Sequence, residues 1–569
     1  MHLFAKKELN LQRILYIRND RKLIGMKKFI FFAIAFCSLL ACSSELDDVK
    51  KEIEDLERQA LELQRQKDSI ENAIKNQQGE NDSTQDKIDQ TEYNLHPAFL
   101  KYMEFLSSDN PVQMVEDAKC EIIGDSVVEC WITNIMDNKK LIPRFVYEGT
   151  EMTIDGKEVV SGKTIVDFRK PISLVVKSKM QTKSYIVYVH SYTGIPMLWL
   201  ETDKRENIAL TTKYYQANLK LVEDVKTRAA GDVIEARVRV RGVGDISWYQ
   251  SKVHPSLQIG KNSYAILFSE VVSLFDESKN NDWELMPNAD DNTMLRTQTM
   301  FYMGHLSNLP FTPRYHFVDL MLNGRYYGTY MLGDRMENAS ARVDVGFNGY
   351  ILKIDAATTG VNFTTSEIEQ PLSILTPSVL VGDNNYRFIA SYLESAEEAL
   401  FGDNFKNESE GWQKYLDMDS FVDWYLINEI AKNEDAFQAE CYMNMKKSGK
   451  LRMGPLWKAE KSFGFEKSSY SGFVVKNTKW YNRLFQDPAF VAKVKERFAY
   501  FYKHKNTIIK EISANAEYLK RSAQENSNKW DVFDKSAGDT KVQYLKTVSS
   551  MKDWLEKRMD WMNTEFGNM

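Results

Sequence analysis

A short apolar segment near the N-terminus, residues 26–42, constrains the compartment in which the rest of this chain can fold. It reads MKKFIFFAIAFCSLLAC, with two lysines before the apolar run and the small residue Ala41 before Cys42. An apolar run of this length is too short to span a bilayer, and its basic start and small-residue end are typical of a secretory signal. We therefore expect the mature chain to fold outside the cytoplasm. Residues 1–25 are then an over-called extension before the true start at Met26.

The end of this segment, Leu39-Leu40-Ala41-Cys42, resembles the lipobox of bacterial lipoproteins. The resemblance implies cleavage before Cys42, lipid on its thiol, and an outer-membrane lipoprotein that faces the cell surface or the periplasm. An ordinary secretory signal with a chance cysteine is the alternative. Outside the signal, no segment of the sequence is long and apolar enough to cross a membrane, so lipid is the anchor we expect.

The residues after Cys42 show a helical repeat. Between residues 45 and 76, apolar side chains recur at alternating spacings of three and four, separated by Glu, Lys, Arg and Gln. Four heptads of this kind predict a coiled coil, ~45 Å long at ~1.5 Å per residue, through which the chain forms a homo-oligomer. A single amphipathic helix on the membrane is the alternative. The polar residues 76–87 predict a flexible linker, so residues 42–94 form the stalk and linker.

Residues 95–205 predict an immunoglobulin-like β-sandwich, because short segments with period-two alternation surround Gly- and Asp-containing turns. Cys120 and Cys130 flank one such turn, at Gly124-Asp125. In an oxidising compartment these cysteines can form a disulfide. Counting back from the turn places them one residue out of register, so the pairing stays open. This region has no convergent set of polar residues, which favours spacing or docking over chemistry.

Residues 206–569 form the largest predicted domain, and strands precede helices in it. This segregated order is typical of an α+β fold. We expect four helices, at Arg387–Leu400, Ser420–Ala431, Pro488–Ile512 and Lys541–Glu565.

The composition excludes some classes of function. The 74 Lys and Arg residues nearly balance the 80 Asp and Glu residues, and no basic block occurs, so we expect no nucleic-acid binding. The sequence also lacks GxSxG, CxxC, HExxH and phosphate-loop motifs. Its seven histidines are scattered, so a histidine-based metal site is not expected. Cys441 stands alone, and we expect it to be a buried apolar residue.

Six segments, taken in order, resemble the CotH kinases, atypical protein kinases named after a spore-coat protein. The segments are RGVGDISW (241–248), WELMPNADDNTMLR (283–296), FTPRYHFVDLMLNGRYYGTYML (311–332), NGYILKID (348–355), NEIAKNEDAF (428–437) and GKLRMGPLW (449–457). The resemblance implies a divergent kinase-like fold that uses ATP and Mg²⁺, when active, to phosphorylate Ser or Thr of exported or surface proteins.

Asp435 is the catalytic aspartate that the resemblance implies. It follows the apolar segment 420–431, which predicts a buried helix with Asp419 as its N-cap. A kinase needs one carboxylate to receive the proton of the substrate hydroxyl and another to hold Mg²⁺. A residue that only caps the end of the helix is the alternative for Asp435.

The metal ligand departs from the family pattern, in which Asp-aromatic-Asp follows GPLW. Here Trp457 is followed by Lys458-Ala459-Glu460, so a lysine stands where the metal ligand belongs. A protonated lysine repels Mg²⁺ and offers no lone pair. Glu460 and Asn433 remain as candidate metal ligands. Lys458 can instead pair with Asp435 or contact a phosphate directly, which would give nucleotide binding without metal.

Four further residues lie in the family-like segments or near them, and they are candidates to line a nucleotide cleft: Arg241, Lys252, Arg296 and Asp334. Structural ion pairs are the alternative for each. Two functions therefore remain open. The first is phosphorylation of exported proteins, and the second is a catalytically degenerate pseudokinase that acts as a binding or scaffold protein.

Overall fold

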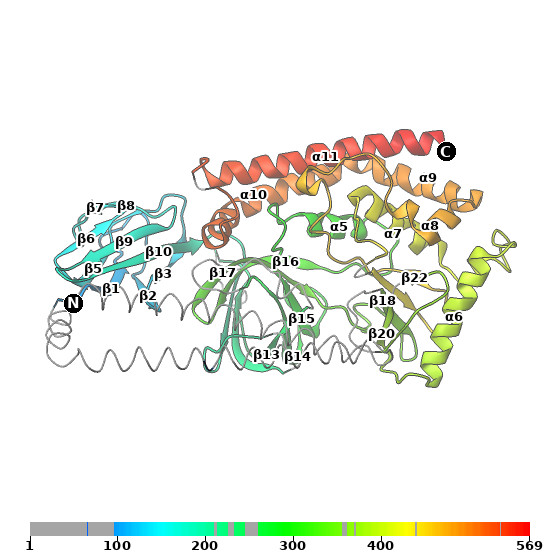
Figure 1. Ribbon diagram of the computed structural model, residues 1–569, viewed down its shortest axis with the longest axis horizontal. Helices are drawn as coiled ribbons and strands as arrows, with labels where there is room; N and C mark the ends of the chain where they lie inside the picture. The colour runs from blue at the N-terminus through cyan, green and yellow to red at the C-terminus, as the bar shows by residue number, and fades with distance from the viewer. Residues whose placement is uncertain are drawn as a thin grey trace. The chain divides into compact units, whose positions relative to one another are not determined.

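The computed structural model describes residues 96–209, 213–225, 233–244, 260–354, 361–368, 371–438, 441–534 and 536–569, together with Arg65 (Figure 1). The predicted signal, Cys42, the coiled coil and Lys252 lie outside these residues and stay predictions. In the part of the chain that the structure describes, we find no helix with the length and apolar character needed to cross a membrane.

The chain divides into two compact units. The first comprises Met1–Leu100, Tyr147–Met152 and Val175–Lys183, and the second comprises Lys101–Val146, Thr153–Leu174 and Ser184–Met569. Within the first unit, the Thr150 amide donates to the Lys177 carbonyl at 2.7 Å. All the described candidate residues of the kinase-like region belong to the second unit.

The N-terminal region is rich in strands, as its alternating pattern predicts. Its strands form one sheet in the order β5-β1-β2-β3-β10-β9-β6-β7 and a separate pair, β4-β8. An immunoglobulin-like topology stays a prediction. The strands are β1 (Phe99–Phe105), β2 (Ala118–Ile123), β3 (Val127–Ile135), β4 (Lys140–Leu141), β5 (Arg144–Glu148), β6 (Glu151–Ile154), β7 (Lys157–Glu158), β8 (Val166–Asp167), β9 (Ile172–Lys177) and β10 (Thr182–Tyr192).

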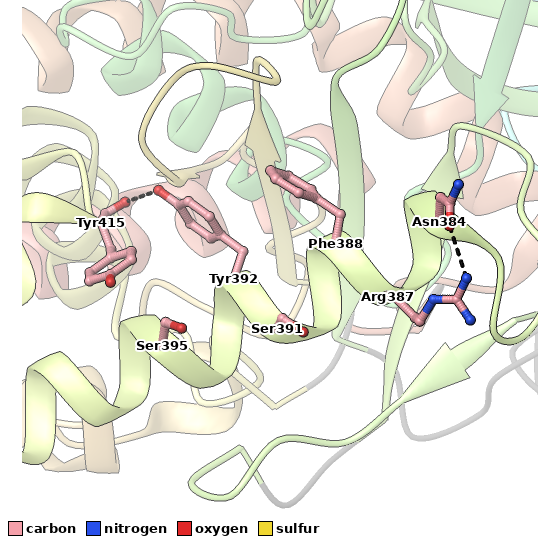
Figure 2. A pocket seen from close by; sticks show the side chains of 7 residues that line it. All are labelled: Asn384, Arg387, Phe388, Ser391, Tyr392, Ser395 and Tyr415. Atoms are coloured by element: carbon pink, nitrogen blue, oxygen red, sulfur yellow. Dashed lines mark hydrogen bonds between the residues drawn. The ribbon is translucent and has the colours of Figure 1, made fainter.

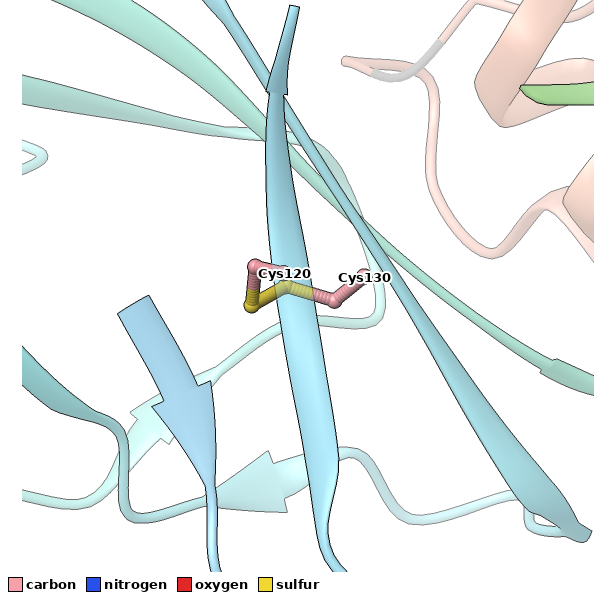
Figure 3. The surroundings of a disulfide bond; sticks show 2 residues. All are labelled: Cys120 and Cys130. Atoms are coloured by element: carbon pink, nitrogen blue, oxygen red, sulfur yellow. A yellow bond between two sulfur atoms is a disulfide. The ribbon is translucent and has the colours of Figure 1, made fainter. Parts of the chain in front are cut away.

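The hairpin of β2 and β3 has a different register from the one expected. Ile123 pairs with Val127, so three residues rather than two form the loop between the strands. The additional loop residue brings Cys120 directly opposite Cys130, and the two form a disulfide (Figure 3). The one-residue offset in the sequence count is therefore wrong, because it assumed a two-residue turn.

A closed barrel follows, in the order β11-β12-β13-β14-β15-β17-β16. Alternate side chains point inward and form its core, among them Leu219, Val240 and Ile266. β11 pairs with β12 and, in parallel, with β16, although the expected boundary at residue 205 assigned it to the sandwich. The strands are β11 (Met197–Thr202), β12 (Tyr215–Val222), β13 (Val233–Val243), β14 (Ser263–Val272), β15 (Asn280–Met286), β16 (Tyr315–Leu322) and β17 (Arg325–Asp334).

The remaining strands form a five-stranded sheet in the order β19-β20-β18-β21-β22. Helices pack around it and around one another, and α10 and α11 lie side by side (Figure 1). The strands are β18 (Tyr350–Ile354), β19 (Asn362–Phe363), β20 (Leu372–Thr376), β21 (Cys441–Met445) and β22 (Arg452–Met453). The α-helices are α5 (Arg296–His305), α6 (Asn384–Phe401), α7 (Met418–Ala431), α8 (Lys479–Leu484), α9 (Pro488–Lys503), α10 (Lys505–Trp530) and α11 (Thr540–Asn568). Short 3₁₀ helices cover Trp412–Lys414, Phe465–Lys467 and Val475–Asn477.

Two helix boundaries differ from the expectation. The segment Pro488–Ile512 is not one helix, because the backbone leaves the helical region at His504, between α9 and α10. α10 then continues to Trp530. The N-cap of α7 is Asp417 rather than Asp419, since the Asp417 side chain accepts the Ser420 amide at 2.9 Å.

The end of α10 joins the barrel to the N-terminal strands within the second unit. Lys529 pairs with Glu129 of β3 at 2.6 Å, and both side chains are buried. Glu525 pairs with Lys139 and, at 3.3 Å, with the ring of His190 in β10. Trp530 packs in the core of the barrel and donates to the Tyr327 carbonyl at 2.8 Å. Buried ion pairs and a tryptophan therefore hold these elements together.

Candidate functional site

Helix α7 positions the Asp435 loop. Nearly all of its side chains are buried, as a sequence that is apolar on nearly every face predicts. It ends at Lys432, which has a left-handed backbone with φ 50° and donates to the carbonyls of Ser469 and Ser471, both at 2.9 Å. The end of the helix therefore places the start of the following loop next to the chain segment around residue 470.

The loop after α7 presents Asp435 to solvent. The Asn433 amide nitrogen Nδ2 donates to Asn428 Oδ1 at 3.0 Å, so this side chain holds the loop against the helix. The Gln438 amide donates to the Asp435 carbonyl at 3.1 Å, which leaves the exposed Asp435 carboxylate out of this turn. A cavity of about 300 Å³ adjoins this loop. Its lining residues are Asn433, Glu434, Ala436, Gln438, Phe473, Val474, Asn477 and Thr478.

A buried ion pair supports the loop 470–474, which contributes Phe473 and Val474 to the lining of this cavity. Arg558 of α11 donates to Glu429 Oε1 of α7 at 2.8 Å and to the Tyr470 and Gly472 carbonyls. Glu429 in turn accepts the Val474 amide at 2.8 Å. Burial raises the pKa of Glu429, although Arg558 opposes that shift. The pair therefore ties two helices and the loop 470–474 into one support for the cavity.

The start of α5 forms a second part of the site. Asp291 is buried, and its Oδ2 accepts the Arg296 amide at 2.9 Å. Its Oδ1 accepts the Thr293 amide at 2.8 Å and pairs with the Arg296 guanidinium. Both oxygens of Asp291 are therefore occupied within the loop that precedes α5.

The segment after β22 is held against this loop. Arg296 Nε donates to the Ser462 carbonyl at 2.8 Å, and the Ala459 amide donates to Thr297 Oγ1 at 3.1 Å. The Phe463 amide donates to the Ala431 carbonyl at 2.8 Å, which joins the segment to the end of α7. Residues 459–463 thus link the α5 region to the helix that carries the Asp435 loop.

Glu460 lies at the centre of this second part. Its Oε2 accepts the Asp290 amide at 3.0 Å. Burial raises the pKa of Glu460, and the neighbouring carboxylates of Asp291 and Asp290 add to that rise. The positive charge of Lys458 opposes the shift without reversing it. The structure therefore places Glu460 against the loop before α5, and Arg296 holds the same segment through the Ser462 carbonyl.

The residues present do not fit the Mg²⁺ ion that the resemblance implies. Among the described residues, no group of three or more His, Cys, Asp or Glu side chains is arranged to hold a metal. Both oxygens of Asp291 already accept hydrogen bonds. Lys458 stands beside Glu460, and its ammonium would repel a dication.

Two other candidates lie apart from this cluster. Arg241 lies over the ring of Tyr214 and donates to the Gly242 carbonyl. Asp334 accepts the Arg314 amide at 2.9 Å and Arg342 Nε at 3.1 Å, and burial raises its pKa. Arg241 therefore contacts an aromatic ring and a backbone carbonyl, and Asp334 is engaged by Arg314 and Arg342. These contacts favour a structural role for both.

A larger hollow of about 540 Å³ lies on α6 (Figure 2). Figure 2 shows aromatic rings and small hydroxyls along one side of the helix, with the Tyr392 hydroxyl donating to the Tyr415 carbonyl at 2.9 Å. None of the residues that the sequence singled out lines it. The lining consists of Asn384, Arg387, Phe388, Ser391, Tyr392, Ser395 and Tyr415.

Sequence reasoning missed the residues that support the cavity beside Asp435. Arg558 lies in the last helix, 129 positions after Glu429, and Phe473 and Asn477 lie in a polar stretch without a motif. The one signal in the sequence is an arginine, Arg558, within the amphipathic last helix. Such a signal does not reveal its partner, because the partner is set by the packing of α11 on α7.

Comparison with known proteins gives one strong match. A family model described as CotH kinase protein matches residues 238–562, more than half of the chain. A search of curated proteins found no match. A solved structure described as a proposed glycoside hydrolase from Bacteroides thetaiotaomicron is similar at 13% identity over 51% of this chain and 87% of that one. Its TM-score is 0.15, so it carries no argument about fold or function.

Proposed function

Because this chain belongs to the CotH kinase protein family, we propose that it is a membrane-tethered nucleotide-binding protein with a kinase-like domain. The nucleotide site is the cluster around Lys458, Glu460 and Arg296. One observation carries this proposal. Lys458, with its positive charge, stands beside Glu460 in the segment that α5 and α7 hold in place. Ammonium and guanidinium groups are the side chains that recognise phosphate.

The tether is a lipid on Cys42, followed by the coiled coil of residues 45–76 as a self-associating stalk. We place the protein in the outer membrane, facing the cell surface or the periplasm. A lipid anchor of several acyl chains holds a protein firmly, whereas a single chain binds weakly. Labelling cells with a radioactive fatty acid tests this part: the label enters the wild type and is lost in Cys42→Ala. Label retained in that variant would refute the lipidation site.

Nucleotide binding is tested on the full-length chain in detergent. Isothermal titration with ATP should give saturable binding, and Arg296→Ala should weaken it or destroy the fold of the α5 region. Circular dichroism distinguishes these two results for the variant. An absence of binding to ATP, ADP or GTP, with and without Mg²⁺, would refute the proposal.

Phosphoryl transfer is a second candidate function, and the exposure of Asp435 beside a cavity favours it. In this scheme the Asp435 carboxylate takes the proton from a Ser or Thr hydroxyl of an exported protein. The hydroxyl oxygen then bonds to the γ-phosphorus of ATP, the bond to the β–γ bridging oxygen breaks, and ADP leaves. Labelled ATP tests this: phosphate should appear on protein with the wild type and be absent with Asp435→Ala. Equal labelling by both would exclude Asp435 as the base.

A partner-binding role without transfer is the outcome if no phosphate is incorporated. In that case the protein acts as a pseudokinase that recognises a nucleotide and a surface partner. The lysine in place of a metal ligand is the residue that favours this outcome, because transfer without a held metal loses charge stabilisation in the transition state.

A further inference from the structure

The cavity beside the Asp435 loop is lined by hydrogen-bond acceptors and by one negative charge. We propose that this cavity binds a basic side chain, lysine or arginine, of a partner protein. The inference goes beyond the proposed function, because binding of a basic side chain here requires no nucleotide. It also supplies the chemistry of the surface partner, which the proposed function leaves open.

The size and the apolar walls of the cavity suit one side chain. Its volume is about 300 Å³, and its lining comes from two segments, 433–438 and 473–478. This volume lies at the lower end of the range of ~300–1,000 Å³ that is typical of ligand sites. Phe473, Val474 and Ala436 supply apolar atoms to the lining. The methylene stem of a lysine or an arginine packs on such a surface while its charged head contacts polar groups.

Two amide side chains of the lining are oriented by hydrogen bonds. Asn428 Nδ2 donates to the Trp424 carbonyl at 3.0 Å, so Asn428 Oδ1 is the acceptor for Asn433 Nδ2, also at 3.0 Å. Asn477 Nδ2 donates to the Phe473 carbonyl at 2.6 Å. The nitrogen of each lining amide is therefore directed to the protein. Within the described part of the chain, the oxygens of Asn433 and Asn477 accept no hydrogen bond, so they remain as acceptors for a ligand.

The Thr478 hydroxyl and the Glu434 carboxylate add further acceptors. Thr478 Oγ1 donates its proton to the Val475 carbonyl at 2.8 Å, so its lone pairs remain. Glu434 is exposed, and it supplies the negative charge of the lining. A lysine ammonium has three N–H donors and an arginine guanidinium has five, and neither group has an acceptor. A set of acceptors with one negative charge is therefore complementary to a basic side chain.

The basic residues near the cavity are engaged elsewhere. Lys432 donates to two backbone carbonyls, and Arg558 pairs with Glu429. The ammonium of Lys476 lies 4.8 Å from the centre of the Phe473 ring. Lys432, Arg558 and Lys476 are not among the described residues that line the cavity. The acceptors of the lining are therefore left for a basic group from outside the chain.

The place of the cavity connects it to Asp435. Asp435 lies in the chain between Glu434 and Ala436, and both of these residues line the cavity. An extended chain advances by ~3.3–3.6 Å per residue, so a partner with its basic side chain in the cavity has its neighbouring residues close to Asp435. If the phosphoryl-transfer scheme holds, the acceptor Ser or Thr should lie within about two residues of a lysine or arginine.

The experiment compares two peptides on the full-length chain in detergent. The first is acetyl-Gly-Ser-Lys-Gly-Gly-amide, and the second has norleucine in place of lysine, which keeps the apolar stem and removes the ammonium. Saturation-transfer NMR titrations give the dissociation constants. The wild type should bind the lysine peptide about fivefold or more tightly than the norleucine peptide, because only the ammonium makes charge-assisted hydrogen bonds.

Two substitutions of Glu434 test the assignment to this cavity. Glu434→Gln should weaken the binding of the lysine peptide by about two- to fivefold, the range for one exposed ion pair. Glu434→Lys should abolish the binding, because it places a like charge in the lining. Glu408 is exposed and does not line the cavity, so Glu408→Lys is the matched control and should bind as the wild type does. Circular dichroism confirms that each variant is folded.

The possible outcomes separate this inference from the proposed function. Equal binding of the two peptides by the wild type, or binding of neither, would overturn the inference. Binding of the lysine peptide that Glu434→Lys retains, or that Glu408→Lys loses to the same extent, would also overturn it. Titration of the same samples with ATP provides the separation. ATP binding without a preference for lysine leaves the nucleotide site in place, whereas a preference for lysine without ATP binding supports the cavity assignment and refutes the nucleotide site.

Discussion

The end of α10 and the surroundings of Glu460, both in the second unit, contain buried charge and balance it differently. At the end of α10, burial alone would raise the pKa of Glu129 and of Glu525, but Lys529, Lys139 and His190 outweigh it and both pKa values lie below their usual range. Around Glu460, burial and the carboxylates of Asp291 and Asp290 outweigh Lys458, so the pKa is raised.

The difference concerns the protonation state in which each carboxylate contributes to folding. A carboxylate whose pKa is lowered by a buried partner contributes to folding in its ionised form. A carboxylate whose pKa is raised is held in the fold at a cost when it is ionised, as Glu429 and Asp334 are in structural ion pairs.

Replacing Lys529 by Met should have the largest effect on stability. It leaves Glu129 as a buried carboxylate without its 2.6 Å partner, and breaking a buried pair in this way costs about 3–5 kcal/mol. Urea denaturation of the full-length chain measures the loss. The double variant Glu129→Gln with Lys529→Met should recover most of it, because no buried charge is then left alone. A loss no larger than that of the exposed Lys461→Met would contradict the prediction.

Acid should weaken the α10 region next. The pKa values of Glu129 and Glu525 are lowered from 4.5, so their contribution is present above pH 4.5 and is lost as the pH falls through the lowered values. The contribution of Asp319 to stability depends on pH in the opposite direction. Burial raises its pKa from 3.8 to about 6, so its contribution is present below pH 3.8 and is lost as the pH rises through about 6.

Denaturation measured between pH 3 and pH 7 checks the sign of both pH dependences of stability. The double variant Glu129→Gln with Lys529→Met should show a flatter loss below pH 4.5 than the wild type. Asp319→Asn should flatten the slope between pH 4 and pH 6. Identical acid slopes for the wild type and the double variant would show that the Glu129 pair does not carry the effect.

Replacing Glu460 by Gln should have a smaller effect, and of the opposite sign. Since the pKa of Glu460 is raised, its contribution is present below the usual value of 4.5 and is lost as the pH rises through the folded-state value. At neutral pH the glutamine variant, which can still accept the Asp290 amide, should be slightly more stable than the wild type. The advantage should shrink as the pH is lowered toward 4.5. The exposed Glu466→Gln is the control and should show no such trend.

Replacing Asp435 by Ala should have the smallest effect on stability, within about 0.5 kcal/mol, because the side chain is exposed and its carboxylate does not hold the loop. Thermal melting measures this. Nucleotide affinity should also stay unchanged, while any phosphate transfer should vanish. A marked loss of stability would show that Asp435 caps the end of α7, which is the structural alternative from the sequence.

The local pattern of the sequence predicted the elements that carry the candidate site. The segment 420–431, apolar on nearly every face, becomes the buried helix α7. The family-like segments predicted the CotH kinase family, and the family model confirms it over residues 238–562. Periodicity and motifs suffice here because each signal lies within one element or one short segment.

Other features depend on contacts between distant residues. The register that pairs Cys120 with Cys130 depends on loop length, and the place of β11 in the barrel depends on its pairing with β16. α10 continues past Ile512 through a polar sequence that reads as exposed. Its last turns are instead buried, because residues of the N-terminal strands supply the opposite charges.

The sequence by itself determined the family, the buried helix before Asp435, and the lysine at position 458. It also set the prediction of a signal and lipid anchor at Cys42, which lies outside the described residues. Only the tertiary structure decided that Glu460 and Arg296 both join the segment 459–463 to the loop before α5, while Arg241 and Asp334 make structural contacts. The physical reason is that a residue's charge and size are local properties, whereas its partners are set by packing, and the partners decide whether a charge holds the fold or is available to a ligand.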